Sequence, residues 1–425
     1  MTDIKQSDSF SPAIEQSRSM PKGWEIKKLG EVCEIMNGGT PDTTVPRFWD
    51  GENLWITPKD MGKLESIYVD DTFRKITDDG LKNSSAKILP PNSIILSSRA
   101  PIGHLAVNTK PISTNQGCKG LVPHKGVGTL YLYYFLSNSV DLLNGLGTGA
   151  TFKELSGLKL GSVEIPLPPL NEQLRIVSIL DEAFAAIATA KANAEQNLKN
   201  AKYLFESYLQ RVFEKKGEGW EQRRVQDISK IANGYAFASK DFQSTNTIKS
   251  IKITNVGVKE FVEETDNYLP EKFKGTFKEF QVKNGDIVIA LTRTIIAAGL
   301  KVAVVPESYD GALINQRVAV LVPNEKLVNR RFLYNFLTTT GVSKYVLAHV
   351  NTLMQPNLSI NDLKNLLVPC PPLTVQQSIV QNLDALSAET KRLETIYQQK
   401  LINLEELKKS VLQKAFNGEL ITNKK

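Results

Sequence analysis

The chain has few of the features that mark secreted or membrane-embedded proteins. Its 425 residues contain only three cysteines, Cys33, Cys118 and Cys370, which are far apart and in no Cys-x-x-Cys spacing. This pattern argues against a disulfide framework or a zinc site and favours reduced thiols. No apolar run is long enough to span a membrane, and residues 1–20 are polar, without the apolar core of a secretory signal. We therefore expect a cytoplasmic protein that does not associate with membranes.

The sequence also lacks the motifs of common DNA-modifying machinery. It has no Asn- or Asp-Pro-Pro-aromatic tetrapeptide to hold a flipped base and no Walker loop for a motor. The histidines, His104, His124 and His349, are not at metal-ligand spacing. The glycine-rich residues 145–150 follow a segment that reads as helix, not a strand, so we interpret them as a flexible loop. We expect no catalytic, cofactor or metal site in this chain.

The charge balance permits an anionic partner without requiring one. The formal net charge is +7 and the isoelectric point is about 9.0. Many proteins with no nucleic-acid role are mildly basic, so charge alone identifies no partner. With 41% hydrophobic residues, the chain is long enough for two or three domains, each with its own core.

The dominant feature of the sequence is an internal duplication. Gly23-Trp24 opens a stretch ending at Asn37-Gly38, and a similar stretch from Gly219-Trp220 to Asn233-Gly234 begins 196 residues later. Further matches follow in the same order in both halves: residues 115–116 with 315–316, 132–136 with 333–337, 155–156 with 358–359, 166–173 with 369–376, and 209–213 with 412–416. Six agreements in one order do not arise by chance.

Both halves have the same predicted plan. Short β-like runs separated by Gly, Pro, Asn and Asp turns come first, then a proline cluster, then a long helix. This predicts an α+β fold with two mixed α/β domains joined by two long helices. The expected boundaries are a tail at 1–22, a first domain at 23–165, a first helix at 166–216, a second domain at 217–368, a second helix at 369–418, and a tail at 419–425.

The two helical segments carry apolar stripes with the alternating three- and four-residue spacing of a coiled coil. Neither 170–213 nor 373–416 contains glycine or proline. The predicted coiled-coil positions are Val177, Leu180, Phe184, Ile187, Leu198 and Phe205 in the first helix and Leu383, Leu386, Leu393, Tyr397, Leu404 and Leu407 in the second. A polar residue, Lys191 or Lys400, interrupts each stripe.

We expect the two helices to pair with each other, antiparallel, within one chain. The first helix ends a few residues before Trp220, and by the repeat Phe416 at the end of the second should lie near Trp24. An antiparallel pair satisfies both conditions and predicts two globular regions separated by a rod. A coiled coil between two chains would also bury the stripes, but the duplication already supplies a partner in the same chain.

Polar and basic residues suited to DNA follow several of the short strands. Arg, Asn and Gln can form bidentate hydrogen bonds with guanine or adenine edges, and Lys and Thr suit phosphates. The candidates are Thr57, Lys59, Arg99, Asn115 and Gln116 in the first half and Thr254, Asn255, Arg293, Asn315 and Gln316 in the second. Residues shared by both halves can equally serve the fold. If the halves read different bases, their base-reading residues should differ.

Taken together, these motifs resemble the DNA-specificity subunits of Type I restriction-modification systems. The resemblance lies in the Gly-Trp openings, in Gly38-Gly39-Thr40-Pro41 with residues 48–60, in the proline motif at 168–173, and in the helix end at 209–213. It covers residues 23–420. The second half departs from it, with Gly234-Tyr235-Ala236-Phe237 in place of the Gly-Gly-Thr-Pro segment and Val375 where the first half has Glu172.

The resemblance implies a non-catalytic subunit that binds double-stranded DNA. Each domain would read one half of a bipartite target, and the helices would set the gap and dock the partners. Two modification subunits would use S-adenosylmethionine to methylate adenine, and two restriction subunits would use ATP and Mg²⁺, while this chain itself would bind no cofactor. Two rival interpretations are a fused restriction-methylation enzyme and a rod with two protein-binding heads.

Overall fold

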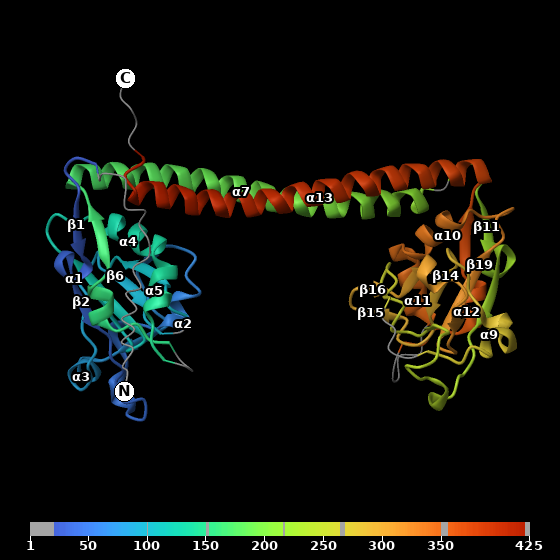
Figure 1. Ribbon diagram of the computed structural model, residues 1–425, viewed down its shortest axis with the longest axis horizontal. Coiled ribbons are helices and arrows are strands. Elements are labelled where there is room, and N and C mark those ends of the chain that lie inside the picture. The colour runs from blue at the N-terminus through green and yellow to red at the C-terminus, as the bar shows by residue number, and fades with distance from the viewer. Residues whose placement is uncertain are drawn as a thin grey trace, which may run out of the picture. The chain divides into compact units, whose positions relative to one another are not determined.

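The computed structural model describes residues 21–99, 101–149, 153–215, 217–263, 268–349 and 356–420. These form two compact units, Met1–Ala194 with Gln399–Lys425 and Glu195–Gln398 (Figure 1). Most of both expected tails, residues 1–20 and 421–425, lies outside the described residues. Each unit takes one half of each long helix. The first unit therefore contains residues from both ends of the chain, and the second unit is one continuous segment.

The first unit is built around a five-stranded sheet in the order β2-β9-β6-β7-β4, beside a three-stranded sheet β5-β3-β8 and the pair β1-β10. The strands are β1 Glu25–Lys28, β2 Cys33–Asn37, β3 Trp49–Ile56, β4 Tyr68–Val69, β5 Arg74–Ile76, β6 Ile94–Ser97, β7 Leu105–Asn108, β8 Ile112–Thr114, β9 Cys118–Pro123 and β10 Glu164–Leu167. The short helices are α1 Leu29–Val32, α2 Pro58–Met61, α3 Asp78–Lys82, α4 Thr129–Asn138, α5 Val140–Leu146 and α6 Gly157–Gly161.

The second unit repeats this plan. Its main sheet has the order β12-β19-β14-β17, and β11 pairs with β20 as β1 pairs with β10. The strands are β11 Glu221–Arg224, β12 Ser229–Asn233, β13 Ser250–Ile251, β14 Ile287–Ala290, β15 Ile295–Ile296, β16 Gly299–Leu300, β17 Val302–Val304, β18 Leu313–Ile314, β19 Val318–Pro323 and β20 Leu367–Cys370. The helices are α8 Val225–Ile228, α9 Phe273–Thr276, α10 Arg330–Leu337, α11 Thr340–His349 and α12 Ile360–Asn365.

The shared plan extends to strand pairing. The parallel contact of β3 with β8 returns as that of β13 with β18. In each unit a helix pair, α4-α5 or α10-α11, follows the sheet, and the core joins helix and sheet side chains in one cluster. The predicted duplication and the mixed α/β class are therefore confirmed. In the glycine-rich stretch, Gly145 and Leu146 extend α5, where a loop was expected, and Ala150 lies outside the described residues.

Both long helices form where the sequence predicts them, α7 at Leu170–Glu214 and α13 at Leu373–Phe416. In the first unit they pack together: Lys191 Nζ lies 2.6 Å from Glu405 Oε1, and Lys408 lies over the ring of Phe184. Residue numbers rise along α7 as their partners' numbers fall along α13, so these segments are antiparallel. Trp24 packs on the cluster that contains Phe416, as the repeat predicts.

In the second unit the same helices enter the other core. Leu209 and Phe213 of α7 and Val380 and Leu383 of α13 belong to one buried cluster with the sheet. Leu209 is fully buried, whereas Leu407, one of the predicted coiled-coil positions, is 48% exposed within the first unit. The packing of α7 against α13 is thus confirmed within the separate units, and the stripe is not buried at every predicted position.

A buried glutamine fastens the start of each long helix to its own unit. Gln173 accepts a hydrogen bond from the Gly128 backbone N–H and donates to the carbonyl oxygens of Gly126 and Pro168. Gln376 accepts from Asn329 N–H and donates to the carbonyl oxygens of Leu327 and Pro371. Both side chains are almost fully buried. The repeat therefore preserves this joint atom for atom.

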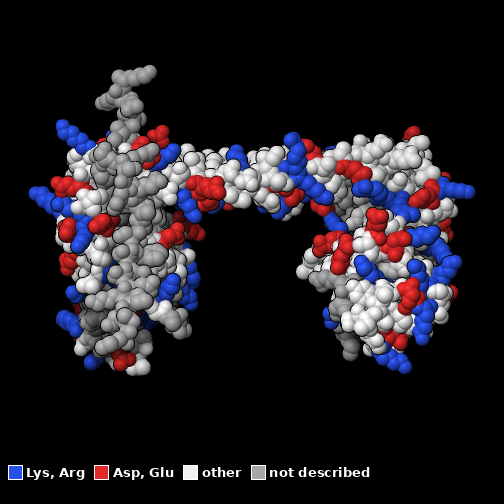
Figure 2. All heavy atoms as spheres, in the orientation of Figure 1, with Lys and Arg blue, Asp and Glu red and all other residues white. Residues whose placement is uncertain are grey.

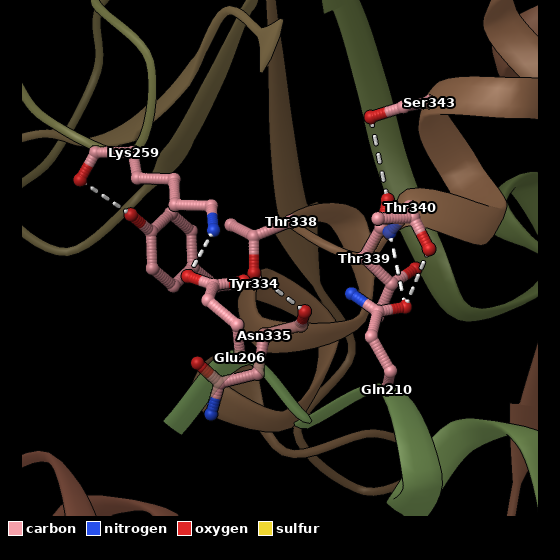
Figure 3. A network of polar contacts seen from close by, with 9 residues as sticks. All are labelled: Glu206, Gln210, Lys259, Tyr334, Asn335, Thr338, Thr339, Thr340 and Ser343. Atoms are coloured by element: carbon pink, nitrogen blue, oxygen red, sulfur yellow. Dashed lines mark hydrogen bonds and ion pairs between the residues drawn. The ribbon is translucent and has the colours of Figure 1, made fainter. Parts of the chain in front are cut away.

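The far end of α7 is joined to the second unit by a polar network (Figure 3). Glu206 Oε1 lies 2.5 Å from Lys259 Nζ, and the Lys259 carbonyl oxygen accepts a hydrogen bond from the Tyr334 hydroxyl. One turn along α7, Gln210 accepts from both the backbone N–H and the hydroxyl of Thr340. The second domain is therefore tied to α7 by polar contacts as well as by the apolar core.

Candidate nucleic-acid interface

In the first unit, strand ends converge on the connection between β8 and β9. Asn115 N–H donates to the carbonyl oxygen of Ile56 at the end of β3, and Ser98 N–H, just after β6, donates to that of Gly117. Gly39 N–H, after β2, donates to the Thr114 carbonyl. The loops after these strands therefore form one surface. It brings together all five candidates of the first half.

The candidates on this surface are used in different ways. Thr57 caps α2, because its hydroxyl and backbone N–H both bond to the Asp60 carboxylate. The next basic residue, Lys59, is exposed. Asn115 accepts a hydrogen bond from Gly117 N–H through Oδ1, and Gln116 accepts one from the Thr40 hydroxyl. Thr57 and Asn115 thus shape the loops, while Lys59 and Gln116 face outwards.

Arg99 lies at the edge of the same surface. Its guanidinium is 3.1 Å from the Glu154 carboxylate, and both side chains are about half exposed. Lys119 of β9 is buried beside them, and burial lowers its pKa. A surface ion pair of this exposure contributes little stability. An incoming phosphate could replace Glu154 as the partner of Arg99 at small energetic cost.

The second unit builds the same convergence around residues 315–317. Asn315 N–H donates to the Ile251 carbonyl at the end of β13, and Leu291 N–H, after β14, donates to the Arg317 carbonyl. Asn315 Oδ1 accepts from Arg317 N–H, as Asn115 Oδ1 does from Gly117. Gln316 and Arg317 are exposed. The two units therefore present equivalent strand-end surfaces.

The loop after β13 holds Thr254, which is exposed, and Asn255, which is buried. Asn255 Oδ1 accepts from Lys252 N–H, and its amide donates to the Val262 carbonyl. Its amide also lies 3.3 Å from the Tyr309 hydroxyl. The Asn255 side-chain amide is therefore hydrogen-bonded inside the fold. Asn255 therefore holds the loop in shape, and the side chain available to a ligand is Thr254.

Arg293, after β14, is exposed and has a positive φ of 50°, which is uncommon for a residue with a side chain. Such backbone strain often occurs at functional sites. Burial, and then the charge of Arg293, lower the pKa of the neighbouring Lys301. Thr292 is the counterpart of Arg99, because it pairs with Asn357 as Arg99 pairs with Glu154, so Arg293 lies one residue further along the same loop. Arg99 and Arg293 each lie near a lysine whose pKa is lowered by burial.

Sequence reasoning missed several residues of these surfaces. Thr40 and Lys119 in the first unit and Tyr235 and Arg317 in the second lie among the candidates, although the sequence patterns do not predict them. Lys119 and Arg317 are not shared between the halves, so a search for repeated residues could not find them. The signal that could have found Tyr235 is the departure from the repeat directly after Gly234.

The surface charge is mixed and not of one sign. Figure 2 shows Lys and Arg side chains interspersed with Asp and Glu on the visible face. Within the described ranges, no group of three or more His, Cys, Asp or Glu side chains is arranged to hold a metal ion. No described helix is both long and apolar enough to cross a membrane. The strand-end surfaces can form hydrogen bonds and carry a modest positive charge.

Two copies of one α/β domain, each with a polar strand-end surface and each closed by a long helix, define a duplicated recognition protein. The family described as Type I restriction modification DNA specificity domain matches residues 21–200 and again residues 217–404. These two matches cover most of the chain. The chain belongs to this family.

Individual relatives match over most of the chain. The chain is 28% identical over 426 residues to the Type I restriction enzyme MjaIX specificity subunit of Methanocaldococcus jannaschii, covering 94% of each chain. A second relative from that organism, the MjaVIII specificity subunit, is 25% identical over 420 residues with the same coverage. The family resemblance expected from the sequence motifs is thus confirmed.

Solved structures share the fold. One, from a study of complex assembly and conformational transition in a type I R-M system, has a TM-score of 0.72 at 19% identity, covering 95% of this chain and all of that one. The HsdS subunit from Thermoanaerobacter tengcongensis has a TM-score of 0.64 at 19% identity, covering 96% of this chain and all of that one. At this identity the likeness shows the fold alone.

Proposed function

We propose that the chain is the DNA-specificity subunit of a Type I restriction-modification complex and that each unit reads one half of a bipartite double-stranded target. The observation that carries the proposal is the pair of equivalent strand-end surfaces around residues 115–117 and 315–317. Exposed Lys59, Gln116, Gln316 and Arg293 offer the side chains that suit phosphates and base edges. Thr57, Asn115, Asn255 and Asn315 hold the loops that present them.

In this proposal α7 and α13 form an intramolecular antiparallel coiled coil that fixes the gap between the half-sites. The Lys191–Glu405 pair and the buried Leu180 and Leu383 support it. The glutamine joints at Gln173 and Gln376 would fix each domain on its helix. Bases between the half-sites would go unread because no domain reaches them.

The same helices would dock the modification subunits. Tyr203 and Leu204 of α7 are 62% and 49% exposed, and Ile402 and Leu407 of α13 are 53% and 48% exposed. Large apolar side chains exposed on a regular helix are suited to a partner's apolar surface. Leu407, predicted as a coiled-coil core residue, would then serve the partner interface.

The chemistry would be supplied by partners. Two modification subunits would bring S-adenosylmethionine to an adenine in each half-site, and two restriction subunits would bring ATP and Mg²⁺, all in a prokaryotic cytoplasm. This chain would read DNA and bind no cofactor of its own. Its net charge of +7 suits a reader whose partners also grip the duplex.

The direct test is a genome-wide map of methylated adenine in cells with and without this chain, with the modification partner present in both. We expect one bipartite motif with a fixed gap to lose methylation when the chain is deleted. Unchanged methylation would contradict the proposal and favour a rod with protein-binding heads. Purified chain alone should transfer no labelled methyl group to DNA, whereas a fused enzyme would.

The gap is tested by shortening both helices equally. Removing seven residues from the middle of each helix preserves the heptad and shortens it by about 10 Å, since each residue rises about 1.5 Å. At about 3.4 Å per base pair, the gap in the methylated motif should shrink by about three base pairs. A motif with its original gap would refute the role of the helices as a ruler.

Docking is tested by placing a charge on the exposed apolar face of α7. Tyr203→Glu with Leu204→Glu should abolish co-purification with the modification subunit and leave thermal unfolding of the chain unchanged. Lys202→Glu, which puts the same carboxylate on a different face of α7, is the control and should retain the partner. Equal loss in both variants would show that charge, and not this apolar face, governs the interaction.

A further inference from the structure

The two units diverge at one position beside their shared strand-end surfaces. Strands β2 and β12 both end at an Asn that is followed by Gly, and both glycines pass close to the opposing backbone. A Cβ on Gly38 would lie 1.9 Å from the Asn115 carbonyl oxygen, and one on Gly234 would lie 2.1 Å from that of Asn315. The glycine is therefore required by the shared fold. The residue that follows is Gly39 in the first unit and Tyr235 in the second.

In the first unit there is no room for a side chain at this position. A Cβ on Gly39 would lie 2.3 Å from the backbone nitrogen of Ala86. The Gly39 carbonyl oxygen accepts a hydrogen bond from the indole N–H of Trp55. The next residue, Thr40, donates its hydroxyl to the amide oxygen of Gln116. Here the surface carries a Thr-Gln pair.

In the second unit the same position carries a large ring with a fixed backbone. Tyr235 N–H donates to the Ile314 carbonyl at 3.0 Å, and the Tyr235 carbonyl accepts from Gln316 N–H at 3.0 Å. Tyr235 is therefore held directly beside Gln316. These bonds fix where both side chains begin.

The ring of Tyr235 rests on a floor of phenylalanines. Its centroid lies 4.6 Å from that of Phe277, 5.1 Å from Phe237 and 5.4 Å from Phe280. The side chain is still 41% exposed. Among the residues that the structure describes, neither the Tyr235 hydroxyl nor the Gln316 amide has a hydrogen-bond partner. Two exposed polar side chains thus start from neighbouring, hydrogen-bonded backbones, and the ring of one of them packs on phenylalanines.

We propose that Tyr235, together with Gln316, contacts bases and sets the sequence specificity of the second unit, which rests on the proposed function as a specificity subunit. A Gln amide matches the paired donor and acceptor of adenine in the major groove. A tyrosine hydroxyl both donates and accepts, and its ring contacts a thymine methyl or a base face. In the first unit the equivalent role falls to Thr40 and Gln116.

The surroundings suit a DNA backbone on either side of this pair. Lys274 and Lys278 are exposed and alternate with the phenylalanines of the floor, and Arg317 follows Gln316. Cations flanking a base-contacting pair would bind phosphates and hold the domain in register. The first unit has a glycine, Gly39, at the position of Tyr235. The difference between the halves is what two domains reading different half-sites require.

The rival explanation is that Tyr235 merely covers the phenylalanine cluster. Tyr235→Phe separates the two, because it keeps the ring on its floor and removes only the hydroxyl. Tyr235→Ala removes the ring as well. Thr40→Val is the reciprocal change in the first unit. Lys326→Ala is the control, an exposed cation beyond the opposite end of β19 from Gln316.

The experiment maps methylated adenine genome-wide in cells carrying the modification partner and each full-length variant. We expect Tyr235→Ala or Tyr235→Phe to relax one or more positions of one half-site and to leave the other half-site and the gap unchanged. Thr40→Val should alter the other half-site, and Lys326→Ala neither. On purified complexes, discrimination at the relaxed position should fall on the order of tenfold.

Two results would overturn the inference. One is an unchanged motif in both Tyr235 variants. The other is weaker methylation of an unchanged motif with Tyr235→Ala and no effect of Tyr235→Phe, which is the signature of a structural ring. If the unmutated chain directs no bipartite motif, the proposed function fails instead, and the two failures are distinguished in the same experiment.

Discussion

Replacing Gln376 by leucine tests whether the start of α13 is held on its domain by hydrogen bonds. The side chain is fully buried and makes three of them: Oε1 accepts from Asn329 N–H at 2.8 Å, and Nε2 donates to the Pro371 and Leu327 carbonyls at 2.8 and 3.2 Å. Leucine has nearly the same size and can form none of them. Three backbone groups then stay buried without a side-chain partner.

The expected cost follows from these bonds. A typical intramolecular hydrogen bond contributes about 1 kcal/mol net, and leaving its partner unsatisfied costs about 1–3 kcal/mol. Three bonds therefore predict a loss of at least about 3 kcal/mol. In a unit of about 200 residues, each kcal/mol shifts the unfolding midpoint by about 2–4 °C, so the transition of the second unit should fall by about 6–12 °C.

The measurement is calorimetry of the full chain, which can separate two transitions if the units unfold independently. Gln377→Leu is the matched control, since Gln377 is exposed on the next position of α13. Gln173→Leu should lower the transition of the first unit by a similar amount, because its three bonds are equivalent. If Gln376→Leu costs no more than Gln377→Leu, the joint contributes nothing and the argument from its geometry is wrong.

Three further substitutions have smaller or opposite expected effects. Lys191→Ala should lower the free energy of unfolding by less than about 1 kcal/mol, and high salt should remove the difference, because Lys191 and Glu405 are both about half exposed; a loss of several kcal/mol would contradict this. Gly39→Ala should lower the free energy of unfolding by about 1–3 kcal/mol, because its methyl group would clash with Ala86. Gly145→Ala lies in a helix with open space around it and should raise the free energy of unfolding by up to about 1 kcal/mol. Chemical denaturation of both variants measures the two effects.

The long helices could be predicted to within a residue because their sequence signal is local. An absence of glycine and proline over more than forty residues leaves little alternative to a helix, and the proline clusters fix where each begins. The placement of Trp24 beside the Phe416 cluster followed from the repeat alone. These features depend on the spacing of apolar residues and on the order of motifs along the chain, both of which can be read from the sequence.

Side-chain burial could not be predicted in the same way. Asn255 follows a strand, as surface-loop residues do, yet it is almost fully buried because its amide closes the loop against the Val262 carbonyl. Leu407 matches the coiled-coil spacing but is half exposed, since a heptad pattern does not say how wide the covered stripe is. Both outcomes depend on neighbours distant in sequence, which a single sequence does not reveal.

The duplication helps to distinguish residues that maintain the fold from residues that set specificity, because each half can be compared with the other. Asn115 and Asn315 are shared by the two halves. In both, the side-chain oxygen accepts a hydrogen bond from the backbone N–H two residues later, which stabilises the loop. Gln116 and Gln316 are also shared. The Gln116 side chain accepts a hydrogen bond from the Thr40 hydroxyl, whereas the Gln316 backbone N–H donates to the Tyr235 carbonyl. A shared residue in a differing environment can therefore read a different base. Specificity would then lie in the neighbours of the repeated glutamine as much as in the glutamine itself.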